Sequence, residues 1–90
     1  MVKAMPNRAI VTARVKRIED TAEPNVFHAV VELLSSESVP GFANFTDRFI
    51  GKTVEATLFL KPKRAPRELM RLVMKYEGDE RGGSFYGEEG

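Results

Sequence analysis

Cysteine and tryptophan are absent from this chain of 90 residues, and histidine occurs once, as His28. The absence of cysteine excludes a disulfide framework and a thiolate metal site, and it fits a reducing compartment. One histidine cannot supply a metal cluster or a proton relay that needs two imidazoles. We therefore expect no metal and no cofactor, and we expect His28 to be an ordinary surface residue of a strand.

Long apolar runs are absent as well. None approaches the ~20 residues that a membrane-spanning helix requires. The first nine residues contain one Lys and one Arg but lack the apolar core of a secretory signal. These absences predict a cytoplasmic protein that does not bind a membrane.

Catalytic signatures are also missing. The serines of residues 35–38 do not form a nucleophile-elbow pattern. Gly82-Gly83 lacks the spacing and the Lys-Ser/Thr ending of a phosphate-binding loop. The carboxylates are scattered, and nothing in their spacing requires two of them to meet. We expect a protein that is not an enzyme and has no catalytic residues.

Instead of such motifs, the sequence alternates apolar and polar residues with a period of two. This period is typical of strands with one face on a core and the other in water. It is found in Val11-Ala13-Val15, Phe27-Ala29-Val31-Leu33, Val54-Ala56-Leu58-Leu60 and Met70-Leu72-Met74-Tyr76. The expected core consists of Val11, Ala13, Val15, Phe27, Ala29, Val31, Leu33, Val54, Ala56, Leu58, Leu72 and Met74.

The first strand is expected from about Arg8 to Glu19. Its apolar phase inverts at Arg17-Ile18, which predicts a β-bulge, because a bulge turns the following side chains to the other face. Further strands are expected over residues 26–35 and 52–61.

Residues 39–50 fit two interpretations. Phe42, Phe45 and Phe49 recur at helical spacing. A short strand over 41–45 followed by one helical turn over 47–50, with Thr46 as its N-cap, fits better.

Residues 67–77 are also ambiguous. They alternate as a strand through Met70, Leu72, Met74 and Tyr76, yet they contain many helix formers and follow Pro66. We favour the strand, and a helix is the alternative.

These elements predict a mainly β fold, a small barrel of five to six strands with one short helical turn. Closure is expected because an open sheet of this size would expose its edges. The order of elements resembles the OB fold, and a small SH3-like barrel is the alternative. We expect a flexible lead-in over residues 1–7, a single barrel over 8–77, and a Gly-rich acidic tail over 78–90 that contributes at most a short added strand.

Charge is divided unevenly along the chain. Residues 1–76 contain 13 Lys and Arg against 8 Asp and Glu, whereas residues 77–90 contain one Arg against five acidic residues. A basic body favours an anionic partner, and an acidic tail could compete for the same surface.

The loop around Pro62 and Pro66 is the most basic segment. In an OB barrel, it would be the loop between the last two core strands, and the resemblance implies a role in nucleic-acid binding. Phe59, which should point outward, could stack on a base. The sequence thus predicts a small binding module for single-stranded nucleic acid, with Arg14, Lys16, Phe59, Lys61, Lys63, Arg64, Arg67, Arg71 and Lys75 as binding residues.

The alternative is a protein–protein interaction module or a small subunit of a larger complex. The group of Phe42, Phe45 and Phe49 either caps the end of the barrel or docks on a partner. Phe85-Tyr86 could add an edge strand to another copy, which would give a homodimer.

Overall fold

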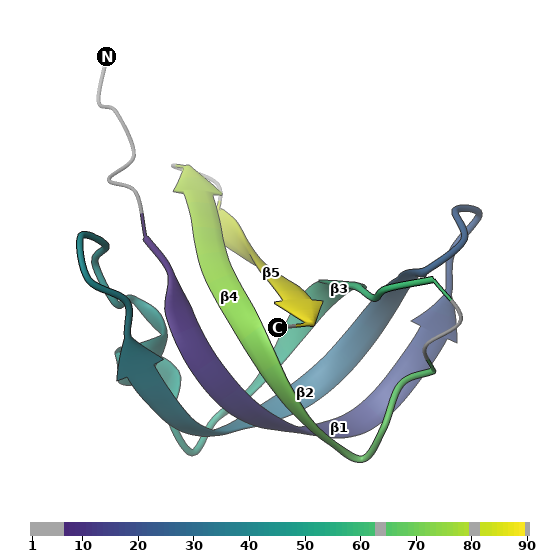
Figure 1. The fold of residues 1–90 in the computed structure, drawn as a ribbon, viewed down its shortest axis with the longest axis horizontal. Helices are drawn as coiled ribbons and strands as arrows, with labels where there is room; N and C mark the ends of the chain where they lie inside the picture. The colour runs from purple at the N-terminus through teal and green to yellow at the C-terminus, as the bar shows by residue number, and fades with distance from the viewer. Residues whose placement is uncertain (1–6, 63–64, 80–81, 90) are drawn as a thin grey trace.

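The structure is a computed structural model that describes residues 7–62, 65–79 and 82–89. It contains β1 (Ala9–Asp20), β2 (Val26–Ser38), the 3-10 turn η1 (Thr46–Phe49), β3 (Thr53–Phe59), β4 (Leu69–Asp79) and β5 (Gly82–Glu89). The strands close into a barrel in the order β1-β2-β3-β5-β4, with β4 pairing back on β1. Figure 1 shows β1 and β2 curving along the base of the barrel, with β4 leaning across them.

Neighbouring strands are antiparallel, except that β3 and β5 run parallel. Within the barrel, β4, β1, β2 and β3 lie side by side in that order, which is the Greek-key arrangement. The predicted mainly β barrel with one short helical turn is confirmed, and it is compatible with an OB-like or an SH3-like assignment. The only helix in the described ranges is η1, four residues long, so no described helix could cross a membrane.

The barrel interior holds the apolar residues that the alternation places inward. Every residue of the expected core is either buried or packed against the buried cluster. The cluster also includes Ala9, Leu60, Met70 and Phe85. The strand interpretation of residues 67–77 is confirmed, because Leu72 and Met74 are fully buried as inward residues of β4.

The bulge predicted in the first strand is present. The register of β1 against β2 shifts between Val15, which pairs with Val31, and Arg17, which pairs with Val30. After the shift, Ile18 pairs with the buried Ala29, so the apolar phase does invert. A second shift, between Thr12 and Ala13, has no counterpart in the sequence analysis.

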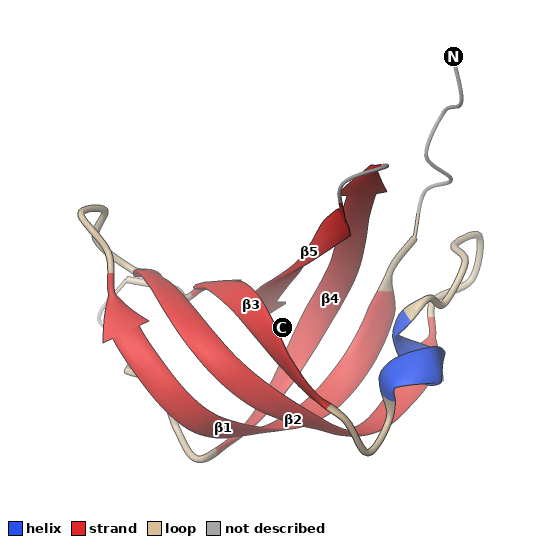
Figure 2. Ribbon diagram, turned by 180° about the vertical axis from the view of Figure 1, so that it is seen from behind, coloured by secondary structure: helices blue, strands red, loops and turns tan. Residues whose placement is uncertain are grey.

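The segment between β2 and β3 differs from its prediction in detail. Instead of a short strand, Ala43 forms a single bridge with Asn7, and the helical turn is the 3-10 turn η1 (Figure 2). Thr46 is not the N-cap but the first residue of this turn. The N-cap residue is Phe45, whose side chain forms no capping hydrogen bond, and Asn44 Oδ1 accepts hydrogen bonds from the Asp47 N–H at 3.1 Å and the Thr46 hydroxyl at 2.8 Å.

β5 occupies the part of the chain that the sequence analysis treats as a tail. It lies between β3 and β4 and pairs with both, since Phe85 is opposite Ala56 on one side and Tyr76 on the other. Phe85 is 5% exposed and belongs to the core. The expectation that Phe85-Tyr86 adds an edge strand to another copy is therefore wrong, because both edges of this segment are already paired.

Candidate nucleic-acid interface

The basic loop does not lie where the OB resemblance implied. It joins β3 to β4, whereas the last two strands are joined at residues 80–81. The difference arises because residues 82–89, expected to belong to a tail, form the last strand of the barrel, β5. Lys61 is exposed at the start of the loop, and Lys63 and Arg64 lie outside the described residues. At its end, Arg67 forms an ion pair with Glu89 of β5, with Arg67 Nη2 2.6 Å from Oε2.

The expected basic residues of the strands lie on the outer surface of β1 and β4. Arg71 is opposite Thr12, two residues along from Arg14, so Arg14 and Arg71 are diagonal neighbours. Lys75 lies further along β4, opposite Tyr86 of β5. The barrel therefore gathers Arg14, Arg71 and Lys75 along the neighbouring strands β1 and β4, whereas Lys61 and Arg67 lie in the loop between β3 and β4.

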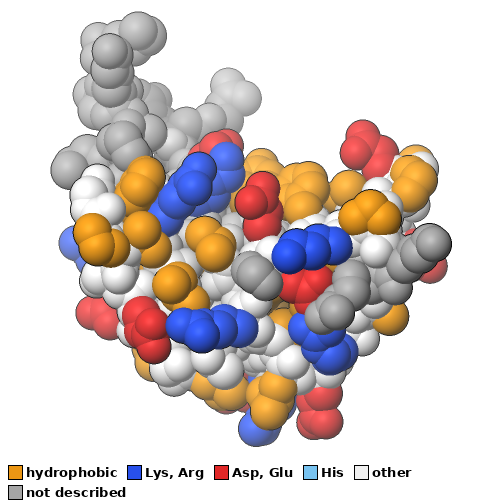
Figure 3. Space-filling model, viewed as in Figure 1, with side chains coloured by type: hydrophobic (Ala, Val, Ile, Leu, Met, Phe, Trp, Pro, Cys, Tyr) orange, Lys and Arg blue, Asp and Glu red, His pale blue; other side chains and the backbone are white. Residues whose placement is uncertain are grey.

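Carboxylates accompany most of these cations. Lys16 pairs with Glu32 at 3.6 Å, Arg71 with Glu37 at 3.3 Å, and Lys75 with Glu77 at 3.0 Å. Basic, acidic and hydrophobic side chains accordingly intermingle on the face shown in Figure 3. Exposed pairs of this kind contribute only about 0–1 kcal/mol, so a phosphate can replace the carboxylate at small cost. Within the described ranges, Arg14 and Lys61 form no ion pair.

Phe59, Lys75 and Tyr86 form a group that we call the aromatic platform. The rings of Phe59 and Tyr86 are stacked, with centroids 6.3 Å apart and planes inclined by 21°. Lys75 Nζ lies 5.7 Å from the centroid of the Tyr86 ring, a cation–π arrangement. The three side chains come from β3, β4 and β5, and Phe59 is 39% exposed.

The platform borders a surface hollow of about 310 Å³. Val73 of β4 lines its apolar part, Arg8 adds a second cation, and Glu77 and Glu88 add carboxylates. This hollow combines aromatic faces with cations, which is what a site for single-stranded nucleic acid needs. Sequence reasoning found Phe59 and Lys75 but missed Tyr86. The alternation of inward Phe85 and outward Tyr86 could have indicated it, had this segment been taken as a barrel strand.

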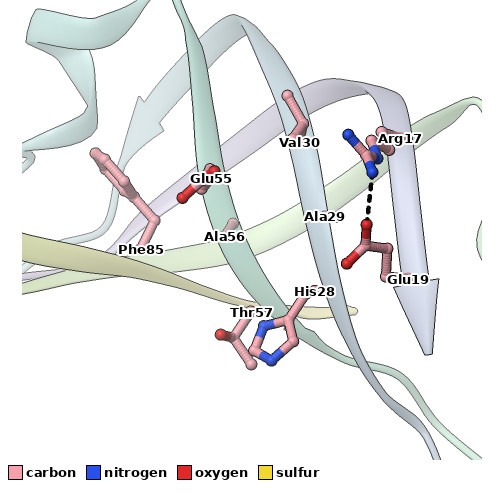
Figure 4. A pocket seen from close by; sticks show the side chains of 9 residues that line it. All are labelled: Arg17, Glu19, His28, Ala29, Val30, Glu55, Ala56, Thr57 and Phe85. Atoms are coloured by element: carbon pink, nitrogen blue, oxygen red, sulfur yellow. Dashed lines mark hydrogen bonds and ion pairs between the residues drawn. The ribbon is translucent and has the colours of Figure 1, made fainter. Parts of the chain in front are cut away.

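A second hollow, of about 300 Å³, lies over β1, β2 and β3 (Figure 4). Its outer residues include His28 beside Thr57, and Arg17 bonded to Glu19 at 2.8 Å. His28 is exposed, as predicted. With Glu19 and Glu55 against a single Arg, this surface disfavours an anion. The described residues contain no group of three or more His, Cys, Asp or Glu placed to hold a metal ion.

The aromatic group before β3 is divided between core and surface. Phe49 packs edge-on against Phe85, with ring centroids 5.0 Å apart, and stacks on Tyr76 at 6.3 Å. It therefore caps the end of the barrel. Phe42 is 37% exposed and lies under the guanidinium of Arg8, whose Cζ is 5.2 Å from the ring centroid.

The fold and the platform define a small Greek-key β-barrel with an aromatic and basic patch on its outer face. The chain matches no protein-family model, no curated protein and no solved structure.

Proposed function

We propose that this protein is a small, non-catalytic binding module that contacts single-stranded nucleic acid through the aromatic platform and the cations of β4 and β1. The observation that carries the proposal is the stacked pair of Phe59 and Tyr86 with Lys75 over the Tyr86 ring. Stacking of a base on an aromatic ring contributes about 1–3 kcal/mol, and every base offers a suitable face.

The surrounding cations suit a backbone that passes over the platform. Lys75 and Arg71 both face outward on β4 and are four residues apart, or about 13 Å at the usual rise of a strand. Arg14 continues this row on β1. A strand of several nucleotides could therefore stack on Tyr86 while its phosphates bind Arg14 and displace the carboxylates that pair with Arg71 and Lys75.

Titration of the 15N-labelled protein with a single-stranded oligonucleotide of mixed sequence tests the proposal. At low salt, we expect amide shifts at Phe59, Tyr86 and residues 71–75. The logarithm of the affinity should fall with the logarithm of salt concentration with a slope of about −0.7 per phosphate contacted. A duplex of the same sequence is the control, because its stacked bases cannot reach the platform. An unchanged spectrum at low salt would refute nucleic-acid binding.

A second candidate function is protein binding, by a small subunit of a larger complex. Two exposed apolar side chains support it, Leu69 at 52% and Phe42 at 37%. Substituting either residue should weaken the binding of a protein partner. It should leave oligonucleotide binding unchanged, because neither residue belongs to the platform.

A further inference from the structure

β1 is flanked by β2 on one side and by β4 on the other, and it extends beyond β4. It pairs with β2 as far as Asp20, but its pairing with β4 ends at Arg14 opposite Leu69. One further backbone bond follows, from the Val15 N–H to the Glu68 carbonyl at 2.7 Å. In the described part of the chain, residues 17–20 pair with β2 alone. Figure 2 shows this end of β1 at the margin of the sheet.

Beyond Val15, the second edge of this segment borders a surface hollow. Residues 15–18 of β1 line this open hollow of about 240 Å³ together with Pro66, Arg67 and Glu68 of the segment before β4. In an antiparallel sheet, a strand directs part of its N–H and C=O groups to each neighbour. An unpaired row of such groups is a template on which another strand can add.

The order of side chains along this edge is complementary to itself. Lys16 and Arg17 come first, Ile18 stands in the middle, and Glu19 and Asp20 follow. If the segment paired antiparallel with a copy of itself, centred on Ile18, then Arg17 would face Glu19 of the other copy. Lys16 would face Asp20 in the same way. Opposite charges directly across two strands stabilise their pairing, and like charges destabilise it.

These side chains are exposed, and the ion pairs that they form within one chain, Lys16 with Glu32 and Arg17 with Glu19, are surface pairs that can be exchanged at small cost. The side chains of Arg17 and Glu19 are 72% and 58% exposed, and they form an ion pair within one chain at 2.8 Å (Figure 4). In a symmetric pair of chains, the two ion pairs would meet and form a network of four charges. Ile18 is a large hydrophobic residue that is 37% exposed, and it would contact its own copy at the centre.

We propose that two copies of this protein associate by antiparallel pairing of the Lys16–Asp20 edges of β1, with Ile18 on the two-fold axis. The contact is isologous, because the same surface serves on both copies. Five residues from each chain bury less surface than a stable interface requires. The association is therefore weak and depends on concentration. It does not depend on the platform, which lies on β3, β4 and β5.

Charge reversal tests the pairing, with sedimentation equilibrium from micromolar to millimolar protein as the measurement. The native protein should form dimers as its concentration rises. Arg17→Glu and Glu19→Arg should each remain monomeric, because each variant places like charges opposite one another. An equimolar mixture of the two variants should form heterodimers, because each acidic edge then faces a basic edge. A native protein that stays monomeric at millimolar concentration overturns the proposal, as do single variants that associate like the native protein.

A cysteine at the axis tests the register, since the chain contains no other cysteine. Directly opposed residues of antiparallel strands have Cα atoms about 4.5–5.5 Å apart, which is within the range of a disulfide. Ile18→Cys should therefore form a covalent dimer rapidly under mild oxidation. Leu69→Cys is the matched control, an exposed apolar position outside the proposed contact. Equal rates of cross-linking for the two variants would exclude this register.

Discussion

The side-chain amide of Asn7 forms two hydrogen bonds with the backbone of Tyr76. Asn7 Nδ2 donates to the Tyr76 carbonyl at 2.8 Å, and Asn7 Oδ1 accepts from the Tyr76 N–H at 2.7 Å. The ladder between β1 and β4 ends at Ala9 opposite Met74, so Tyr76 stands opposite position 7. There the side chain of Asn7 takes the place of a strand backbone, while Asn7 itself bridges to Ala43.

We expect Asn7→Leu to lower the free energy of unfolding by about 1–3 kcal/mol, because it leaves the N–H and C=O of Tyr76 without these partners. Both hydrogen bonds are half-buried, so water replaces them only in part. Urea denaturation followed by circular dichroism measures the change. Arg8→Leu at the adjacent exposed position is the control. Equal stability of the two variants would show that the Asn7 bonds contribute nothing.

Val31→Asp should abolish folding. Val31 is fully buried in β2, and an unpaired carboxylate in an apolar core costs several kcal/mol. That is a large share of the about 5–13 kcal/mol typical of a domain of this length. Val30→Asp is the control, because Val30 lies on the outer face of the same strand. Thermal melts followed by circular dichroism should show a cooperative transition for Val30→Asp only. A native-like melt of Val31→Asp would contradict the core assignment.

Gly83→Ala should be destabilising because of Tyr76. Gly83 is opposite Gly78 in the β4–β5 hairpin, and the Tyr76 ring lies over both glycines. A Cβ on Gly83 would overlap the ring, and one on Gly78 would lie 2.7 Å from Tyr76 Cε2. Forcing the ring aside should cost about 1–3 kcal/mol, as overpacking usually does.

A double-mutant cycle checks this cause. In a Tyr76→Ala background, Gly83→Ala should cost much less, because the ring that obstructs the new methyl group is gone. Additive losses of stability in the two variants would point to a different origin.

Tyr86→Ala and Phe59→Ala should each weaken binding of a single-stranded oligonucleotide by roughly 5- to 150-fold, the equivalent of about 1–3 kcal/mol of stacking. The two losses should not add, because the two rings stack on each other. Fluorescence anisotropy of a labelled oligonucleotide gives the affinity, and circular dichroism verifies the fold. Phe42→Ala removes another exposed ring and should bind as the native protein does. Native affinity in both platform variants would rule out the platform as the site.

Glu77→Gln should strengthen oligonucleotide binding at low salt. It releases Lys75 from an exposed ion pair, with side chains 48% and 59% exposed, so stability should change little. The gain should disappear as salt rises, because salt screens exposed charges. Glu23→Gln, in the turn after β1, removes the same charge away from the platform. Equal gains in the two variants would indicate net charge rather than release of Lys75. Deleting residues 77–90 would not test whether this acidic segment competes with nucleic acid for the basic surface, because the deletion removes β5 and opens the barrel.

The sequence by itself determined four of the five strands, β1 to β4, and most of the residues that face the core, but not β5. Burial on one face of a strand is written locally, as alternation over a few residues, so Val11, Val31, Leu58 and Leu72 could be assigned without any knowledge of their neighbours. Even the bulge at Lys16 left a local trace, because an apolar residue appeared out of phase two positions later.

Only the tertiary structure decided which strands are neighbours. β5 pairs with β3 through residues as distant in the chain as Ala56 and Phe85, and no local pattern encodes such a partner. The platform follows from this pairing, whereas the open edge of β1 follows from the point at which the pairing of β1 with β4 ends. They depend on where the ends of different strands meet when the barrel closes. This is why Tyr86 and the end of β1 acquire their proposed roles only in the folded chain.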